Sequence, residues 1–218
     1  VVDSGMDYRH EDLKDNLWKN SDEISGNGVD DDQNGYVDDV MGYDFHNNDA
    51  DPMADDHDPM TGSPIFHGTH VAGIIGASGD NGIGGAGMSF QVKLMSLKFL
   101  GRDGSGYFSD AIKAIDYAIN NGAKIINNSW GGSMSSQALT DAVQRARDAG
   151  VLFVASAGNG GSDGIGDNND QVPSYPASIR MENVLAVAAT QAQDELTRFS
   201  NYGPTTVHVA APGAEIYS

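Results

Sequence analysis

The sequence contains no cysteine, so it can form no disulfide bond, no thiolate zinc site and no cysteine nucleophile. It also has no apolar run long enough to cross a bilayer, so no transmembrane helix is expected. Basic residues are scarce, since 12 Lys and Arg stand against 31 Asp and Glu and give a net charge of −19. Such a charge repels phosphate backbones. We therefore expect neither nucleic acid nor a membrane among the partners.

What the sequence does contain is a globular composition with one very acidic region. Its 218 residues suffice for one sizeable domain, and 39% of them are hydrophobic. The carboxylates crowd between Asp30 and Asp58. We interpret residues 20–66, rich in Asp, Asn and Gly, as an acidic calcium-binding loop region within the domain. In a chain without disulfides, bound Ca²⁺ is the expected source of added stability.

Short apolar runs alternate with helical patterns along the rest of the chain. Apolar residues between Ser109 and Asn121 recur at the spacing of one helix face, with Ser109 as the expected cap and Gly122 at the end. A second amphipathic helix is expected over residues 136–149. The alternation predicts an α/β fold with a mostly parallel central sheet, helices on both faces, and sites at the carboxyl ends of the strands. The expected strands are residues 92–98, 124–128, 151–155, 184–189 and 206–210.

Three polar residues stand where such sites form. Asp3 ends a Val-Val run, where a carboxylate can orient an imidazole, although a turn or capping role is the alternative for the residue alone. His67 opens His-Gly-Thr-His-Val-Ala-Gly, a small-residue run that predicts a helix with the imidazole at its start. Asn159 follows an apolar strand in Ala-Ser-Ala-Gly-Asn-Gly, and a simple Gly-Asn turn is its alternative.

Taken in chain order, Val-Val-Asp-Ser-Gly-Met-Asp, His-Gly-Thr-His-Val-Ala-Gly and Ala-Ser-Ala-Gly-Asn-Gly resemble segments of the subtilisin-like serine proteases, the subtilases of peptidase family S8. The order of acid before base is the one already known for subtilisin itself. The resemblance covers nearly the whole chain and implies the three-layer subtilisin-like fold. It implies that Asp3 is the orienting acid, His67 the general base and Asn159 the oxyanion donor. His70, on the same helix, is expected to be packed structure.

The resemblance also implies a peptide-binding cleft with two walls, to which an extended substrate adds like a strand. No acidic residue is placed to select Lys or Arg, so an apolar preference is expected. Tyr175–Pro176 is a candidate cis peptide bond. The implied substrate-binding residues are Gly104, Ser105, Gly106, Phe108, Ser129, Trp130, Gly131 and Ser174.

The acidic region contains a segment that resembles a calcium loop. Oxygen-bearing residues recur from Asp30 to Asp38, and Gly35 stands at the sharp turn. The twelfth position is Met41 rather than Glu, so Asp38 or Asp39 would have to substitute for it, and a solvated acidic loop is the alternative. The expected ligands are Asp30, Asp32, Asn34, Tyr36 and Asp38.

Two further calcium sites follow from the resemblance alone. One joins the carboxylate of Asp12 to a loop at residues 80–85, with Asn81, Ile83 and Gly85 as the other ligands. A weaker site resembles one of thermostable relatives, and its residues are Asp44, Asp49 and Asp51.

One segment of the family pattern is absent from the sequence. The family's nucleophilic serine lies in a Gly-Thr-Ser-Met-Ala segment that follows an Ala-Pro-Gly, and the 218 residues contain only the Ala-Pro-Gly, at residues 211–213. We therefore expect residues 1–218 to be a partial subtilase catalytic domain, inactive alone. The parent would be a secreted, monomeric, calcium-stabilised serine endopeptidase that acts on protein or peptide substrates and is made with an N-terminal pro-segment.

Two other hypotheses are weighed against this one. A non-catalytic subtilase-like domain would bind calcium or peptides without cleaving them. A nucleotide-binding α/β protein would need a phosphate-binding fingerprint after its first strand, and the sequence has none there.

Overall fold

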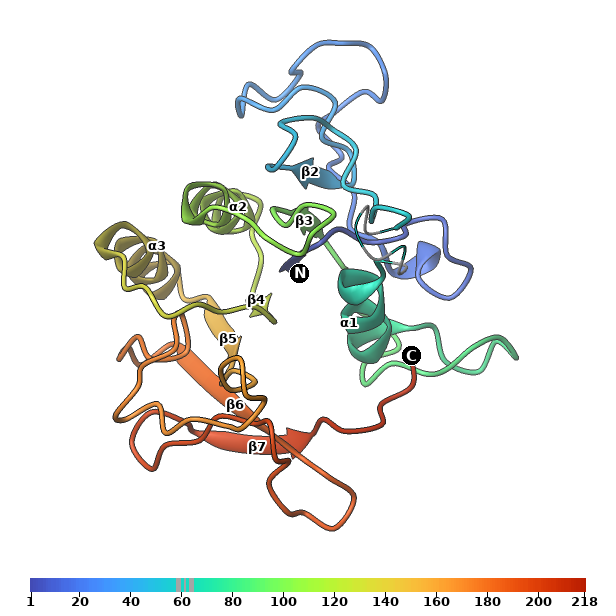
Figure 1. Ribbon diagram of the computed structural model, residues 1–218. Coiled ribbons are helices and arrows are strands. Elements are labelled where there is room, and N and C mark those ends of the chain that lie inside the picture. Colours follow the sequence, from blue (N-terminus) through green and yellow to red (C-terminus); the bar gives the residue numbers. More distant parts are fainter. Residues whose placement is uncertain (58–59, 61, 63–64) are drawn as a thin grey trace. The chain divides into compact units, whose positions relative to one another are not determined.

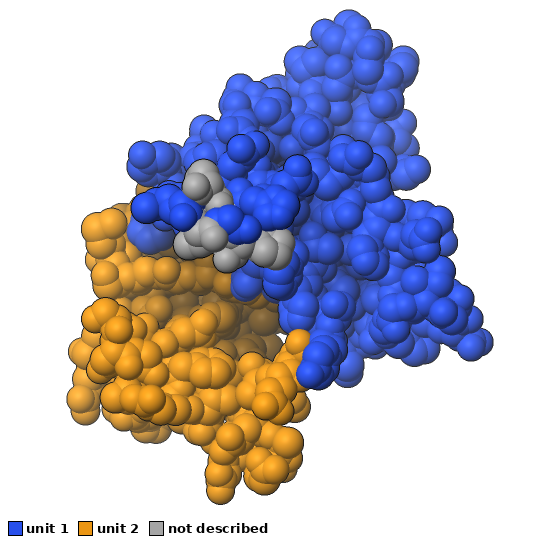
Figure 2. Space-filling view, turned by 45° about the vertical axis from the view of Figure 1, so that its right-hand side comes forward, with its two compact units in different colours: residues 1–121, 217–218 blue, residues 122–216 orange. Residues whose placement is uncertain are grey.

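The computed structural model describes residues 1–57, 60, 62 and 65–218. The chain divides into two compact units, and Figure 2 colours them separately. Unit 1 consists of residues 1–121 with 217–218, and unit 2 of residues 122–216. Each unit has a parallel sheet of its own (Figure 1). Within the described residues, no helix combines the length and the apolar character that crossing a membrane requires.

Unit 1 is built on a three-stranded parallel sheet. The strand order is β1 (Val2–Asp3), β3 (Ser96–Lys98) and β2 (Gly42–Asp44). Helix α2 (Phe108–Asn120) contacts β1 and β3, and its apolar residues are buried at helical spacing. A short 3₁₀ helix, η1, spans Lys14–Asn16. Because β1 and β2 both pair with β3 in parallel register, their terminal carboxylates lie at the same edge of the sheet.

Helix α1 (His67–Gly76) also belongs to unit 1, and its small residues let it approach β1 closely. Gly68 and Gly76 are buried, and a Cβ atom at either would collide with a neighbour: the Gly5 carbonyl and the Val92 side chain, respectively. The predicted small-residue helix beginning at His67 is confirmed. Close packing therefore fixes where the imidazole of His67 leaves the helix.

Unit 2 is a four-stranded parallel sheet whose strands follow the chain order (Figure 1). Helix α3 (Gln137–Asp148) connects the first two strands and packs on the second with Leu139, Ala142, Val143 and Ala146 buried. Buried and less buried residues alternate along the third strand, as expected for a sheet with one more deeply covered face. The strands are β4 (Ile125–Asn128), β5 (Leu152–Ser156), β6 (Val184–Thr190) and β7 (Val209–Pro212).

The elements agree with the predicted order, with local differences. The predicted cap of α2 is wrong, because the helix begins at Phe108 after an extended Tyr107 and Ser109 lies inside the first turn. Gly122, with φ of +74°, follows the helix as predicted. Strand β7 begins at Val209, later than expected. Strand β2 was not predicted, because three residues inside an acidic loop show no periodicity.

Helix α3 offers a direct test of its predicted start. The side chain of Ser136 accepts a hydrogen bond from the backbone N–H of Leu139, so it satisfies one of the helix's free donors. We expect Ser136→Ala to lower the free energy of unfolding by about 1 kcal/mol, measured by urea denaturation. Ser135→Ala, which changes the exposed serine just before the cap, is the matched control. Equal effects of the two substitutions would contradict the capping role.

Candidate active site

A buried carboxylate and an exposed imidazole form the centre of the candidate site in unit 1. Asp3 ends β1 and is 1% exposed, and its Oδ1 lies 2.7 Å from Nδ1 of His67. The same oxygen accepts a hydrogen bond from the Ser4 backbone N–H. Because an ionised carboxylate only accepts, Nδ1 of His67 carries the proton, and Nε2 is left with a free lone pair. The His67 side chain is 56% exposed, so a reacting group can reach it.

Two more hydrogen bonds align the two segments that carry Asp3 and His67. The Gly68 N–H donates to Oγ of Ser4 at 3.1 Å, and the Asp7 N–H donates to Oγ1 of Thr69 at 2.9 Å. The two motifs therefore meet residue by residue, although 64 positions separate Asp3 from His67. This explains why Ser, Gly and Thr accompany Asp3 and His67 in the sequence.

The pKa of His67 is raised above its ordinary value. The hydrogen bond to Asp3 is the main cause, burial of the ring opposes it, and the negative charge of Asp3 adds to it. The folded state therefore favours the imidazolium more than the unfolded chain does, which stabilises the fold below the ordinary pKa of about 6.5. That contribution is lost as the pH rises through the raised pKa. His67 is thus neutral, and able to accept a proton, only above the raised pKa.

In unit 2, the turn after β5 presents Asn159. Asn159 is exposed, and its amide makes no hydrogen bond to any described residue, so it can donate to a ligand. Gly158 and Gly160 flank it with φ of +111° and +74°, values that favour glycine. The turn therefore presents one free amide on a backbone that only glycine adopts easily at both flanking positions.

The predicted cleft residues of unit 2 gather beside this turn. Cβ atoms added to Gly131 and Gly158 would lie 3.2 Å and 3.3 Å from Oγ of Ser174, so these three residues are close neighbours. Gly132 and Tyr175 exchange backbone hydrogen bonds of 2.9 and 2.8 Å. The Tyr175–Pro176 bond is cis, as predicted.

Ser129 and Trp130 continue this wall directly after β4. The hydroxyl of Ser129 accepts a hydrogen bond from the side chain of Asn127 at 3.0 Å. Trp130 is 9% exposed. The structure thus brings together the predicted residues Ser129, Trp130, Gly131, Ser174 and Asn159 within unit 2.

The predicted cleft residues of unit 1 lie in an exposed turn before α2. The Gly101 N–H donates to the Ser105 carbonyl, and Gly104 has φ of +71°. A Cβ atom at Gly106 would lie 2.5 Å from the carbonyl oxygen of Phe99. Phe108 is half-buried and begins α2. One side of this turn is thus exposed to solvent, and on the other side the Phe99 carbonyl packs closely against Gly106.

The segment that leads from β3 to this turn is hydrogen-bonded to Asp3. The carbonyl of Asp3 accepts hydrogen bonds from the N–H groups of Phe99 and Leu100. Next to it, the fully buried Nζ of Lys98 lies 2.8 Å from Oδ2 of Asp55 and 2.6 Å from the Leu100 carbonyl. The exposed turn of unit 1 is therefore connected to Asp3 through main-chain hydrogen bonds.

Comparison with known proteins agrees with this geometry. The family model described as "Subtilase family" matches residues 1–218. The chain belongs to the subtilase family. It is 39% identical to "Subtilisin-like protease 1" of Plasmodium vivax and to "Thermophilic serine proteinase" of Bacillus sp. strain AK1. These matches cover 100% of the chain but only 35% and 44% of the relatives, so the chain spans less than half of either.

Solved structures support the same assignment. The "crystal structure of a cold adapted subtilisin-like serine proteinase" matches with a TM-score of 0.70 and 31% identity, covering 99% of this chain and 62% of that one. A protease from Pseudoalteromonas arctica matches with a TM-score of 0.74 and 30% identity, over 98% and 61%. The predicted three-layer α/β subtilisin-like fold is confirmed.

The acidic loop of this subtilase gathers three carboxylates. Ligand oxygens of Glu23, Asp32 and Asp39 all lie within 4.8 Å of one another, and Glu23 and Asp39 are buried. Asp39 also accepts a hydrogen bond from the Tyr117 hydroxyl on α2 at 2.5 Å. The amide of Asn34 donates to both Asp32 and Asp39. This is the only such three-residue group within the described part of the chain.

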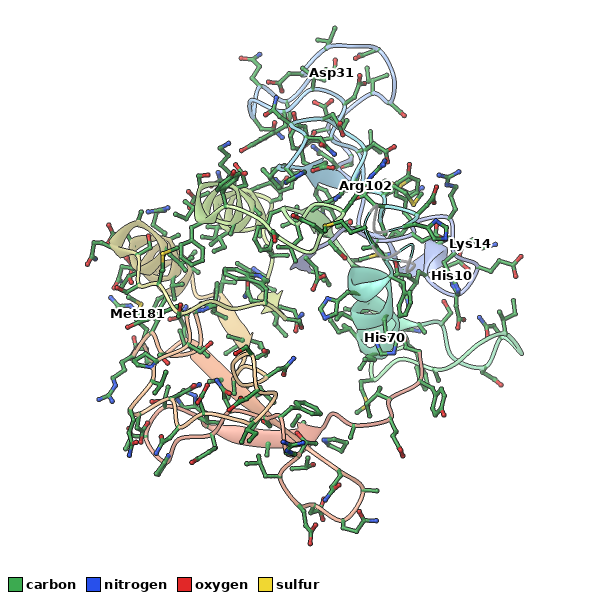
Figure 3. The ribbon with its side chains drawn as sticks, viewed as in Figure 1. His10, Lys14, Asp31, His70, Arg102 and Met181 are labelled. Carbon is green, nitrogen blue, oxygen red and sulfur yellow. The ribbon has the colours of Figure 1, made fainter. Side chains whose placement is uncertain are left out.

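The group differs from the predicted ligand set. Asp32 belongs to it, as does Asp39, one of the two residues expected to substitute at the twelfth position, and Asn34 borders it. Asp30 instead accepts hydrogen bonds from the N–H groups of Asn34 and Gly35. The carboxylate of Asp38 binds the N–H groups at residues 27 and 28, and the ring of Tyr36 packs against other aromatic rings. Sequence analysis missed Glu23, because it precedes the repeated Asp pattern and reaches it only through the folded loop. Asp31, labelled in Figure 3, lies in this same loop.

The other predicted calcium residues divide into two cases. Asp12 is 3% exposed, and it accepts hydrogen bonds from the Asn81 amide at 2.7 Å and the Gly85 N–H at 3.1 Å. Asn81 in turn accepts a hydrogen bond from the Ile83 N–H, so the loop at residues 80–85 lies against the carboxylate of Asp12. Asp44, Asp49 and Asp51 form no group of converging carboxylates in the described residues.

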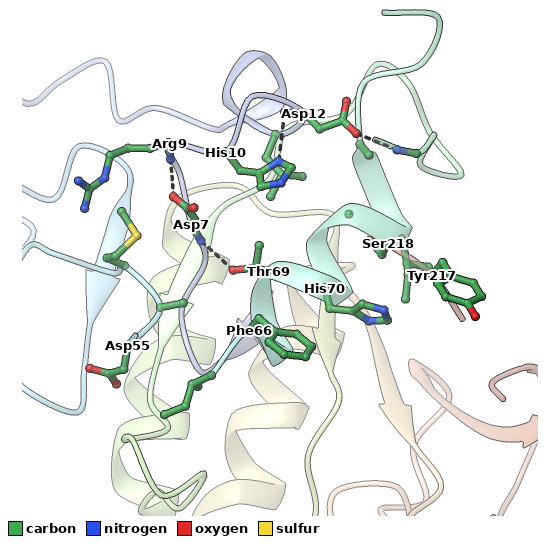
Figure 4. Close-up of a pocket in the computed structure, with 18 of the residues that line it drawn as sticks. Asp7, Arg9, His10, Asp12, Asp55, Phe66, Thr69, His70, Tyr217 and Ser218 are labelled. Carbon is green, nitrogen blue, oxygen red and sulfur yellow. Dashed lines mark hydrogen bonds between the residues drawn. The ribbon is translucent and has the colours of Figure 1, made fainter. Parts of the chain in front are cut away.

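A cavity of about 670 Å³ lies along α1 (Figure 4). Phe66, Thr69 and His70 line it, together with Tyr217 near the end of the chain. His70, expected to be packed structure, is half-buried at this cavity. Asp3 and His67 do not line it, so the cavity is separate from this carboxylate–imidazole pair.

The Asp3–His67 bond predicts how His67 titrates. We expect Asp3→Asn to lower the pKa of His67 toward about 6.5, because the substitution removes the negative charge and weakens the hydrogen bond that favour the imidazolium. NMR titration of the His67 ring protons measures this in the 218-residue chain. Asp7→Asn removes the same charge from the neighbouring turn without touching His67. A His67 pKa that is equal in wild type and Asp3→Asn would show that the pair does not form.

Proposed function

We propose that this subtilase domain supplies the acid, the base and the oxyanion donor of a serine endopeptidase. The observation that carries the proposal is the 2.7 Å contact between buried Asp3 and exposed His67, which fixes the imidazole tautomer. In this mechanism a serine from outside the 218 residues attacks the peptide carbonyl, and Nε2 of His67 takes its proton. Asp3 stabilises the imidazolium that forms.

The remaining steps use the two turns described above. Asn159 donates its free amide to the oxyanion of the tetrahedral intermediate. His67 then gives its proton to the leaving amine, and water hydrolyses the acyl-enzyme with His67 as base. The exposed turn at 104–106 of unit 1 and the wall at 129–131 of unit 2 each offer backbone groups to which an extended peptide substrate can add like a strand. The relatives named above are proteases, which supports the same chemistry for this chain.

We also propose Ca²⁺ as a resident ion. The donor set fits this ion, because Glu23, Asp32 and Asp39 offer only oxygen, the ligand that Ca²⁺ prefers. Three converging carboxylates repel one another, and their partial burial weakens solvent screening, so a divalent cation offsets a large electrostatic cost. Asp12 with the loop at residues 80–85 is the second proposed site. The ions stabilise the folded loops and take no part in the chemical steps.

The proposed calcium sites and the absence of cysteine also bear on where the protein acts. Calcium sites suit an extracellular environment, and a chain without cysteine gains no stability from disulfides there. We propose a secreted, monomeric enzyme that acts on protein or peptide substrates and is made with an N-terminal pro-segment.

Peptidase activity is tested on the product of the complete gene that encodes these residues. We expect a fluorophosphonate probe to label one serine, and His67→Ala to abolish labelling and lower kcat by at least about 10⁴-fold, a scale already known for subtilisin itself. His10→Ala, which removes an imidazole near the cavity of α1, is the matched control and retains labelling. A folded, calcium-binding product that never labels would instead support the non-catalytic binding domain.

Calcium binding is tested by thermal unfolding of the 218-residue chain. At a calcium concentration about 100 times Kd the ion stabilises by about 2.7 kcal/mol, which raises Tm by about 5–10 °C. We expect Glu23→Gln to retain only part of this increase, because it removes one of the three converging carboxylates. Asp22→Asn changes an exposed acidic residue of the same loop and should retain all of it. An equal increase in wild type and Glu23→Gln would contradict binding at this group.

A further inference from the structure

Two buried amides lie directly beneath the turn that presents Asn159. Asn201 and Asn169 are 4% and 2% exposed, and both belong to unit 2. Oδ1 of Asn201 accepts hydrogen bonds from the N–H groups of Gly160 and Asp167 at 2.8 and 2.9 Å. The backbone N–H of Asn201 donates to the Gly158 carbonyl at 2.8 Å. Asn201 is thus bonded to the residues on both sides of Asn159.

Asn169 completes the support from the other side. The Nδ2 group of Asn201 donates to Oδ1 of Asn169 at 2.9 Å, and Nδ2 of Asn169 donates to the Ala157 carbonyl at 2.8 Å. Ala157, Gly158 and Gly160 are therefore all held by this amide pair. Every backbone residue around Asn159 in the turn has a hydrogen bond to Asn201 or Asn169.

The bonding pattern requires amides at both positions. Asn201 must accept on its oxygen and donate on its nitrogen, and Asn169 must do the same, so neither side chain can be flipped. Gly158 fits over the pair because it has no side chain: a Cβ atom there would lie 2.6 Å from Nδ2 of Asn201. Burial strengthens these bonds and makes an unpaired member costly.

We propose that Asn201, supported by Asn169, is a positioning residue for the oxyanion donor Asn159. The inference rests on the proposed function. Oxyanion stabilisation depends on a donor that is already in place when charge develops, and losing such a donor costs about 10²–10³ in kcat, a magnitude known from subtilisin itself. A shift of about 1 Å can cost about 10²-fold. Asn201 acts through Asn159 and does not itself touch the substrate.

The first test measures the turn in the 218-residue chain, without any activity. We expect Asn201→Ala to raise the amide hydrogen-exchange rates of Gly160 and Asp167 by about tenfold or more, because both N–H groups lose their acceptor. Asn201→Asp keeps an acceptor oxygen and should restore part of the protection. Asn183→Ala is the matched control, since Asn183 binds the carbonyls of Val143 and Val151 rather than the turn. Unchanged exchange at Gly160 and Asp167 would overturn the proposal.

The second test uses kinetics of the complete gene product and a double-mutant cycle with Asn159→Ala. We expect Asn201→Ala to lower kcat by about 10–100-fold with KM within about threefold, and to have almost no further effect in Asn159→Ala. Asn169→Ala should follow the same pattern, and it replaces Asn201→Ala if that variant fails to show a cooperative thermal transition. Asn201 would have only a structural role if Asn201→Ala lowered kcat equally in wild type and in Asn159→Ala. The same conclusion would follow if the substitution raised KM and left kcat unchanged.

The outcomes separate the two proposals. If Asn159→Ala leaves kcat unchanged, or if the wild type cleaves no peptide, the proposed function fails. Hydrogen exchange then still decides whether Asn201 and Asn169 hold the turn. If Asn159→Ala lowers kcat and Asn201→Ala does not, the proposed function stands and this inference fails.

Discussion

Polar groups buried away from water are stabilised by hydrogen-bond partners, and this tendency fixes the segments on which the proposed chemistry depends. In unit 1 the buried carboxylate of Asp3 binds both Ser4 and His67, so the end of a strand and the start of a helix cannot move apart without leaving a charge unpaired. In unit 2 the buried amide of Asn201 binds Gly160 and Asp167 in the same way. Both units thus use a buried acceptor to hold an exposed functional group.

Glycine makes these close contacts possible. Gly68 lies against the Gly5 carbonyl, and Gly158 lies over Asn201, at separations that exclude a side chain. The same residues weaken helices and loops by their conformational freedom, so the hydrogen bonds beneath them must compensate. The acidic loop faces a different constraint, because the carboxylates of Glu23, Asp32 and Asp39 repel one another and hydrogen bonds from Asn34 and Tyr117 offset only part of that repulsion.

Sequence predicted the parts that depend on local pattern. The apolar periodicity of α2 and α3, the small-residue helix at His67 and the strand before Asn159 all appear in the structure. Contacts made by loops without periodicity were not predictable. Glu23 meets the Asp residues only after the loop folds, and Asn201 reaches Gly160 across 41 positions. The start of α2 was missed because an extended Tyr107, rather than a capping side chain, sets it.

The buried groups that support His67 and the turn at Asn159 differ in charge for a physical reason. In the proposed mechanism His67 gains a positive charge, so a buried carboxylate beside it becomes more favourable as the imidazolium forms. In the same mechanism the turn at Asn159 faces a developing negative charge, which a buried carboxylate would oppose. Although the chain has 31 Asp and Glu, the buried pair bonded to this turn consists of two neutral amides. The charge that each proposed step creates therefore determines which polar residue can be buried beneath the group that carries the step.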